Sequence, residues 1–252
     1  SMRDDLYEVM ATIEDKFWWF VAKRRIIKSM IDRYAPTSHT TSGEGSKPAL
    51  LDIGCGTGGL LRDMADQYEV SGLDSAEAAR KACGERGFEA KSCWLPDDIP
   101  AEINAFDVCV MSDVLEHVEH DAESVRAAAT RLKQGGIMVC TVPAHMWLWT
   151  KRDEAHHHFR RYNKAQYKAI FEDAGLEPVV VSWYMSHLMP IMILQRIAVK
   201  LFGDKGSDDL TIPAAPVNGI LRWVFASERF WIGRFPMPFG ASLISVHRRV
   251  AD

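Results

Sequence analysis

LLDIGCGTGG, residues 50–59, is the stretch that decides the fold of this chain. It predicts a short apolar strand that runs into a turn of glycines, followed by a helix that begins at about Leu60. Glycines are used where a backbone turns sharply and a ligand comes close, because a Cβ there would clash. The first N–H groups of a helix have no partner within it, so they can bind a polar ligand. We therefore expect a ligand-binding turn at the end of a strand.

A second acidic residue, Asp74, ends the next apolar segment, residues 69–74, and lies 22 positions after Asp52 (74 − 52). An acid at that offset can accept hydrogen bonds from both ribose hydroxyls of a nucleoside that lies across the strand ends. Together, the glycine turn and Asp74 predict a nucleoside-cofactor site.

The identity of the cofactor depends on Asp52 and on the number of glycine fingerprints. Gly54, Gly56 and Gly59 also satisfy G-x-G-x-x-G, but nicotinamide folds usually have an apolar residue where Asp52 stands, and no second fingerprint follows. The D-x-G-x-G-x-G form resembles motif I of class I S-adenosylmethionine (SAM) methyltransferases. The resemblance implies that Asp52 faces the methionine end of the cofactor and that Asp74 binds its ribose. An NAD-dependent enzyme remains an alternative.

The composition limits the class of protein and its location. A chain of 252 residues with 47% hydrophobic and 25% charged residues is typical of one globular α/β domain with insertions, or of two small domains. The net charge of −4 lacks the basic excess of nucleic-acid binders, so no nucleic-acid partner is expected. Five cysteines without C-x-x-C spacing indicate free thiols and a cytoplasmic location. Neither a signal peptide nor a transmembrane helix is predicted.

Strand-like and helix-like segments alternate along the chain, which predicts a parallel sheet with crossover helices. The expected strands are 49–53, 69–73, 88–93, 106–111, 136–142, 178–184 and 242–247, and the expected helices are 5–35, 58–68, 75–86, 121–133 and 164–174. The Gln134–Gly136 turn is expected to cap the helix 121–133. We divide the chain into an N-terminal helical cap and linker (1–47), a cofactor-binding core (48–185), an apolar insertion (186–240) with helices at about 188–202 and 217–232, and a final core strand (241–252).

Two loops with polar side chains are expected beside the cofactor. SDVLEHV (112–118) follows the fourth strand, and TVPAH (141–145) follows the fifth. Loops at the carboxyl ends of parallel strands line the ligand crevice, so both segments should lie next to the transferred methyl group. WLW (147–149), Asp153 and HHHFRRY (156–162) come directly after them.

These motifs together resemble a bacterial branch of the ubiquinone-biosynthesis-like class I methyltransferases. That branch also tends to have an aromatic segment followed by two arginines near its N-terminus, here residues 18–25, and a PFGxSL ending, here residues 238–243. The resemblance covers nearly the whole chain. It implies a Rossmann-like, seven-stranded, mostly parallel sheet with helices on both faces, and SAM as cofactor with S-adenosylhomocysteine as product. It says little about the acceptor, because many members of the branch have no assigned substrate.

The resemblance also implies cofactor contacts around the glycine turn and the strand ends. They are Asp52, Gly54, Cys55, Gly56, Gly58, Asp74, Ser75, Cys93, Trp94, Ser112, Asp113 and His117. Relatives often have an acid after the third strand to contact adenine, whereas this chain has Cys93 and Trp94 there. Asp97 or Asp98 could replace that acid, Trp94 could stack on the base, or a backbone N–H could supply the contact.

Methyl transfer is an in-line displacement at a sulfonium, and a hydroxyl or ammonium acceptor must also lose a proton. Histidine is the natural base near neutral pH, so His117, His145 and His158 are candidate catalytic residues, and Asp153 could orient one of them. His117 could equally make a structural hydrogen bond. The adjacent histidines 156–158 diverge on a regular backbone, so no metal site is expected.

Eight residues are candidate acceptor contacts: Trp18, Trp19, Trp147, Trp149, Asp153, Arg160, Arg161 and Tyr162. The two arginines could bind a carboxylate or phosphate on the acceptor, or could form salt bridges with Asp153 or Glu154. The aromatic side chains could line the pocket or belong to the core.

The apolar insertion and the tryptophans near the N-terminus suggest a small or lipid-like acceptor, such as a quinone precursor, a polyketide or a prenylated intermediate. The insertion could be a lid over that acceptor, a homodimer interface, or a peripheral contact with membrane lipid. We expect SAM-dependent methylation of a small molecule, at oxygen. The alternatives are N- or C-methylation, or a SAM-binding protein without catalysis.

Overall fold

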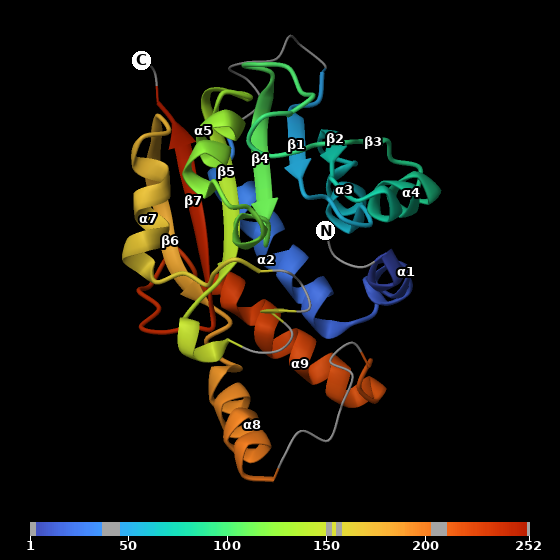
Figure 1. Ribbon diagram of the computed structural model, residues 1–252, viewed down its shortest axis with the longest axis vertical. Coiled ribbons are helices and arrows are strands. Elements are labelled where there is room, and N and C mark those ends of the chain that lie inside the picture. The colour runs from blue at the N-terminus through green and yellow to red at the C-terminus, as the bar shows by residue number, and fades with distance from the viewer. Residues whose placement is uncertain (1–3, 37–45, 150–152, 155–157, 203–210, 251–252) are drawn as a thin grey trace.

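The computed structural model describes residues 4–36, 46–149, 153–154, 158–202 and 211–250. Within these ranges, seven strands form one sheet in the order β3-β2-β1-β4-β5-β7-β6 (Figure 1). The strands are β1 (Ala49–Ile53), β2 (Glu69–Leu73), β3 (Ala90–Lys91), β4 (Phe106–Ser112), β5 (Leu132–Pro143), β6 (Leu176–Tyr184) and β7 (Ser242–Arg249). Only β7 runs antiparallel to its neighbours β5 and β6. The expected Rossmann-like sheet is confirmed.

Helices cover both faces of the sheet. They are α1 (Asp4–Ile13), α2 (Trp18–Tyr34), α3 (Gly59–Met64), α4 (Glu77–Glu85), α5 (Asp121–Ala129), α7 (Lys164–Glu172), α8 (Met189–Phe202) and α9 (Ala215–Ser227), with short 3₁₀ turns η1 (Leu115–His117), η2 (Met146–Leu148) and η3 (Glu228–Phe230). The single helix expected over 5–35 is two helices, α1 and α2, because residues 14–17 form a turn that carries Glu14 and Asp15.

The central strands are apolar on both faces because helices pack on both. In β4, Val108 and Val110 join the core that α2 and α9 cover, whereas Cys109 and Met111 join the core that α5 and α7 cover. Successive side chains of a strand point to opposite faces, so a strand between two helical layers is a continuous apolar run. Because β1 and β4 are paired in parallel in this buried sheet, their carboxyl ends lie side by side.

The expected cap at Gln134–Gly136 is wrong. The helix α5 ends at Ala129, and β5 already begins at Leu132, so both glycines lie inside a strand. Phe106 pairs with Leu132 but Val108 pairs with Ile137, which is a register shift in the ladder. Gly135 has a φ of +78° there. The glycines therefore serve a bulge, which needs the same backbone freedom as a helix cap.

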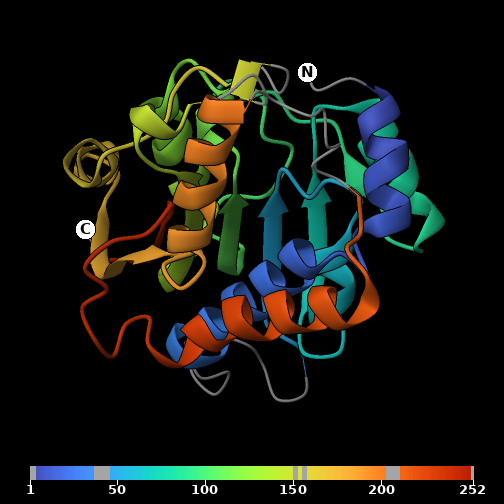
Figure 2. The same cartoon turned by 90° about the horizontal axis from the view of Figure 1, so that it is seen from below.

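The insertion between β6 and β7 contains α8 and α9. Figure 2 shows α9 lying along α2 at the outside of the molecule. The backbone N–H of Trp18 donates to Asn218 Oδ1 (2.9 Å), and the Trp18 ring meets the buried Phe225 ring edge-on at 6.0 Å. Among the described helices, none has the length and apolar character that crossing a bilayer requires.

Candidate functional site

The glycine turn after β1 is held by the acid that follows β2. One oxygen of the buried Asp74 carboxylate accepts the N–H of Gly56 and the other accepts the N–H of Ala76, both at 2.9 Å. Gly54, Gly56 and Gly58 all have positive φ, which favours glycine. A Cβ on Gly54 would meet the Val114 side chain, whereas the space in front of Gly56 is open. A ligand can therefore approach the backbone at Gly56, within reach of Asp74.

Asp52 lies in β1 behind this turn and is 3% exposed. Burial first, and then the nearby charges of Asp74 and Glu14, raise its pKa to about 8 against the opposing effect of the Lys23 ammonium. Carboxylates gathered in a buried place favour a positively charged ligand, because a cation stabilises their ionised form. The site therefore fits a cofactor that is both a nucleoside and a cation.

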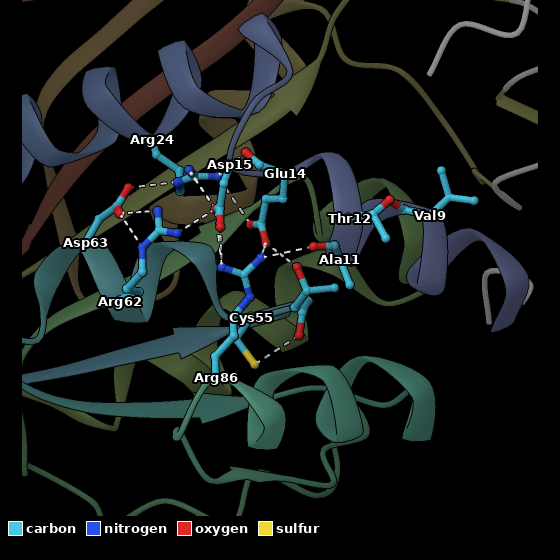
Figure 3. A network of polar contacts seen from close by, with 12 residues as sticks. Val9, Ala11, Thr12, Glu14, Asp15, Arg24, Cys55, Arg62, Asp63 and Arg86 are labelled. Atoms are coloured by element: carbon cyan, nitrogen blue, oxygen red, sulfur yellow. Dashed lines mark hydrogen bonds and ion pairs between the residues drawn. The ribbon is translucent and has the colours of Figure 1, made fainter. Parts of the chain in front are cut away.

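The turn between α1 and α2 is bound to the glycine turn by a network of charged groups (Figure 3). The Thr57 hydroxyl donates to the Glu14 carboxylate, which also pairs with Arg24 at 3.4 Å and Arg86 at 3.2 Å. Asp15 pairs with Arg86 at 3.0 Å. Residues from α2, α4 and the glycine turn thus hold the N-terminal segment beside the cofactor site.

Asp113 stands at the end of β4 with a φ of +54°, a strained conformation for a residue with a side chain. Lys23 Nζ lies 2.6 Å from its Oδ2, and the Thr141 hydroxyl donates to its Oδ1 at 2.9 Å. Burial would raise the pKa of Asp113, but Lys23 and Thr141 together hold that pKa below its ordinary value. The Trp19 ring lies 4.5 Å from Lys23 Nζ. Asp113 is therefore an ionised carboxylate fixed between α2 and β5.

Asp153 and His158 form a carboxylate–imidazole pair. Asp153 is 1% exposed, and its Oδ1 lies 3.0 Å from His158 Nδ1. Arg161 also binds Asp153 with two nitrogens, at 2.7 and 3.0 Å. An ionised carboxylate only accepts hydrogen bonds, so Nδ1 carries the proton and Nε2 is the basic nitrogen of His158. The His158 ring meets the His117 ring edge-on at 4.5 Å.

Glu116 completes this cluster. It is 1% exposed, and burial together with the charge of Asp113 raises its pKa well above the ordinary value. Within the described ranges its Oε2 has no hydrogen-bond partner. Glu116, His117 and His158 each place one donor atom within 4.8 Å of the others, a set that could bind a divalent metal. The sequence analysis argued against a metal site at the adjacent histidines 156–158. Residues 156 and 157 lie outside the described residues, and that argument did not consider Glu116 with His117 and His158.

His145 lies two residues after Pro143, which is the last residue of β5. It has a φ of +62° and stacks on the Trp183 ring at 4.7 Å. Its Nε2 lies 3.1 Å from the carbonyl oxygen of Gly240, so that nitrogen is the donor. Trp147 follows it and is 62% exposed. His145 is therefore held by contacts that leave only Nδ1 for another role.

Several predicted acceptor contacts make contacts within the protein instead. Arg160 pairs with Asp121 at 2.7 Å, and the Tyr162 hydroxyl donates to the same carboxylate at 2.9 Å. Arg161 pairs with Asp153, and Trp149 Nε1 donates to Glu154 at 3.4 Å. The Arg161–Asp153 salt bridge is one of those that the sequence left open, whereas Arg160 pairs with Asp121, an acid that was not among the expected partners. These contacts fix the chain that carries His158.

The residues that were predicted to bind adenine, and their neighbours in the site, make a few contacts within the protein. Cys93 is buried, while Trp94 is 59% exposed and exchanges two backbone hydrogen bonds with Asp98. The Ser75 carbonyl accepts from Arg80 Nη1 at 2.8 Å. The Ser112 hydroxyl lies 3.1 Å from that of Thr141, and Cys55 is buried in the glycine turn. Adenine contacts at these residues stay predictions.

Three residues of the site were not among the candidates: Glu14, Lys23 and Glu116. Lys23 lies four residues after Trp19, a spacing that puts both on one helix face and could have indicated it. Glu116 lies within the SDVLEHV segment but carries no signal that separates it from a surface acid. Glu14 contacts Thr57 across 43 positions, and nothing in the sequence indicates this pair.

The fold and the glycine turn define the class: a Rossmann-like α/β domain that binds a nucleoside cofactor at the carboxyl ends of its strands. The sequence profile of a family described as a methyltransferase domain matches residues 22–181. This match spans more than half of the chain, so the chain belongs to that family and is a class I SAM-dependent methyltransferase. Its cofactor is SAM, which carries a ribose and a positively charged sulfonium.

Curated relatives include the ubiquinone biosynthesis O-methyltransferase of Chromobacterium violaceum, 34% identical over 42% of this chain and 45% of that protein. The chain thus matches less than half the length of that relative. Among solved structures, a putative methyltransferase of Haloferax volcanii in complex with the Trm112 activator has a TM-score of 0.62 at 19% identity, covering 100% and 99% of the two chains. Phosphoethanolamine N-methyltransferase 2 of Haemonchus contortus with SAM has a TM-score of 0.59 at 17% identity, covering 90% and 52%. These structures share the fold.

Proposed function

We propose that this protein transfers the methyl group of SAM to an oxygen atom of a small-molecule acceptor. The observation that carries the proposal is the Asp153–His158 pair beside Asp113, close to the carboxyl ends of β4 and β5. A hydroxyl nucleophile must lose its proton during methyl transfer, and an imidazole oriented by a carboxylate is suited to take it.

In the proposed step, the acceptor oxygen attacks the methyl carbon while its proton moves to His158 Nε2. When bound, SAM supplies the methyl group from its sulfonium, and the sulfur leaves with the bonding electrons as the neutral thioether of S-adenosylhomocysteine. Asp153 stabilises the imidazolium that forms, and Arg161 holds Asp153 in place. The Lys23–Asp113 pair lies at the same strand ends, so we assign it to positioning the acceptor.

The names of the curated relatives favour oxygen as the methylated atom. A fold neighbour that is a phosphoethanolamine N-methyltransferase keeps nitrogen as the alternative, because an ammonium acceptor also needs a base. A SAM-binding protein without catalysis is the alternative of a different class.

The test is the release of S-adenosylhomocysteine with a panel of phenols, catechols, amines and lipid extracts. We expect turnover with a hydroxyl acceptor and a loss of roughly 100-fold or more in kcat for His158→Ala, with SAM affinity unchanged. His120→Ala is the matched control, since that imidazole is 63% exposed and its one ion pair among the described residues is with Glu123. Turnover in His158→Ala within a few-fold of wild type would refute the base. SAM binding without product from any acceptor would favour the protein without catalysis.

A further inference from the structure

Residues 211–240 of the insertion present a cationic surface although the chain is acidic overall. The net charge of the whole protein is −4. Residues 211–240 contain three arginines, Arg222, Arg229 and Arg234, and a single acid, Glu228. Glu228 is 0% exposed, so it contributes no negative charge to the surface. The exterior of this segment therefore presents positive charge alone.

The same segment exposes large apolar side chains in a helical row. Val217, Ile220 and Trp223 recur at every third position of α9 and are 49%, 62% and 73% exposed. Phe230 and Trp231 continue the row beyond the helix. Ten of the seventeen exposed large hydrophobic residues in the described part of the chain lie between residues 186 and 240. Such a concentration of apolar surface indicates an interaction site.

Arginines from two helices gather beside this row. Burial lowers the pKa of Arg25 on α2, and the positive charges of Arg222 and Arg229 lower it further, which shows that the three groups are close. None of the three has an ion pair with an acid in the described ranges. The Arg229 guanidinium lies 4.5 Å from the centre of the Phe230 ring, so cationic and aromatic groups are interleaved. Like charges held together destabilise each other unless an anionic partner binds.

We propose that this surface docks on a bilayer that contains anionic lipids. The α9 docking face consists of Val217, Ile220, Trp223, Phe230, Trp231, Arg25, Arg222 and Arg229. An arginine stacked on a phenylalanine at the end of an exposed apolar row is typical of helices that lie in the membrane interface. Anionic headgroups would neutralise the arginines while the apolar row enters the boundary with the acyl chains.

A second copy of this chain fits the face less well. In a two-fold dimer built on this face the patch meets itself, which brings the two arginine groups toward each other, and residues 211–240 offer no exposed acid to pair with them. The α9 helix also rests on α2, which carries Lys23 and Trp19 at the proposed acceptor site (Figure 2). Docking would therefore bring the acceptor site close to the bilayer. The inference itself does not depend on the acceptor proposed above.

The test is vesicle flotation of the whole protein with phosphatidylcholine vesicles and with vesicles in which a third of the lipid is phosphatidylglycerol. We expect binding to the anionic vesicles that weakens with salt. Arg222→Gln/Arg229→Gln should lower the partition coefficient roughly 25-fold, about fivefold for each arginine. Trp223→Ser should lower it roughly tenfold. The controls Lys168→Gln on α7 and Ile103→Ala, both exposed and far from α9 in the chain, should stay within twofold of wild type.

Three results would overturn the proposal. In the first, the wild-type protein fails to float with anionic vesicles at low salt. In the second, the docking-face variants float as well as the control variants do. In the third, Trp223→Ser changes the dissociation constant of a dimer while no form of the protein binds vesicles. Circular dichroism checks that each variant is folded, and the two docking-face variants are independent of each other. Calorimetry with SAM reports the proposed function separately, so either inference can fail alone.

Discussion

Asp52 provides the sharpest test of the cofactor site, because its protonation should be linked to SAM binding. The carboxyl has a pKa of about 8 in the cofactor-free protein, through burial and the charges of Asp74 and Glu14. A cationic ligand beside it favours the ionised form and returns the pKa toward its ordinary value near 4. We predict that SAM binding expels a proton from Asp52 at neutral pH.

The magnitude follows from the raised pKa. At pH 7, about ten molecules have a protonated Asp52 for each one that is ionised, so SAM binding should release about 0.9 proton. Because that proton must leave, the affinity at pH 7 should be roughly elevenfold below its limit at high pH. At pH 8 the deficit shrinks to about twofold, and at pH 9 it is nearly gone. The affinity thus rises with pH through the raised pKa.

The assay is titration calorimetry in buffers of different ionisation enthalpy, which gives the number of protons released at each pH. Asp52→Asn is the matched control, because it keeps the size of the side chain and loses the titration. The amino group of SAM also titrates near pH 8, so the ratio of wild-type to variant affinity is compared at each pH. A ratio that stays constant between pH 6 and pH 9, with equal proton release in both proteins, would refute the reasoning.

Three further changes test other parts of the site. Asp74→Ala should weaken SAM binding by about 2–3 kcal/mol in calorimetry, because two ribose contacts are lost, and unchanged affinity would exclude ribose binding there. Arg24→Met should lower the free energy of unfolding in urea by about 2 kcal/mol, because the buried Glu14 loses one of its two cations and Asp63 loses its contact with Arg24, whereas Arg25→Met on the exposed side should change it by less than about 0.5 kcal/mol. Equal destabilisation by the two changes would contradict the network of Figure 3. Methyl transfer should persist after dialysis against EDTA, because proton removal by an imidazole needs no metal; a loss restored by a divalent metal would assign Glu116, His117 and His158 to metal binding.

The sheet could be predicted because each strand and the turn after it are indicated by residues that are close together in the sequence. Residues 49–53 are apolar, a glycine turn follows them, and Asp74 ends the next strand, so the order of elements determines where these groups meet. The bulge at Gly135 could not be separated from a helix cap, because both use a glycine with positive φ. Helix ends and bulges depend on pairing between strands that are distant in sequence, and a single sequence does not contain that pairing.

The acceptor side was less predictable because its groups come from separate elements. His158 was a candidate, but Glu116, which places a carboxyl oxygen within 4.8 Å of it, belongs to η1 and lies 42 positions earlier (158 − 116). Arg160 and Arg161, which looked like one anion-binding pair, bind two different acids, Asp121 and Asp153. Adjacent residues of an irregular segment diverge, so identity and spacing alone could not assign their roles.

The consecutive basic residues of α2 show the same principle within a helix. Lys23, Arg24 and Arg25 look like one cationic patch in the sequence, yet a helix turns about 100° per residue and so points them in three directions. Lys23 reaches Asp113 at the strand ends, Arg24 binds Glu14 and Asp63 beside the glycine turn, and Arg25 joins the arginines of the α9 docking face. One helix therefore connects the proposed acceptor site, the cofactor turn and the proposed membrane surface. Because the three side chains act on different partners, substitutions at each should change a different measurement: turnover for Lys23, stability for Arg24 and vesicle binding for Arg25.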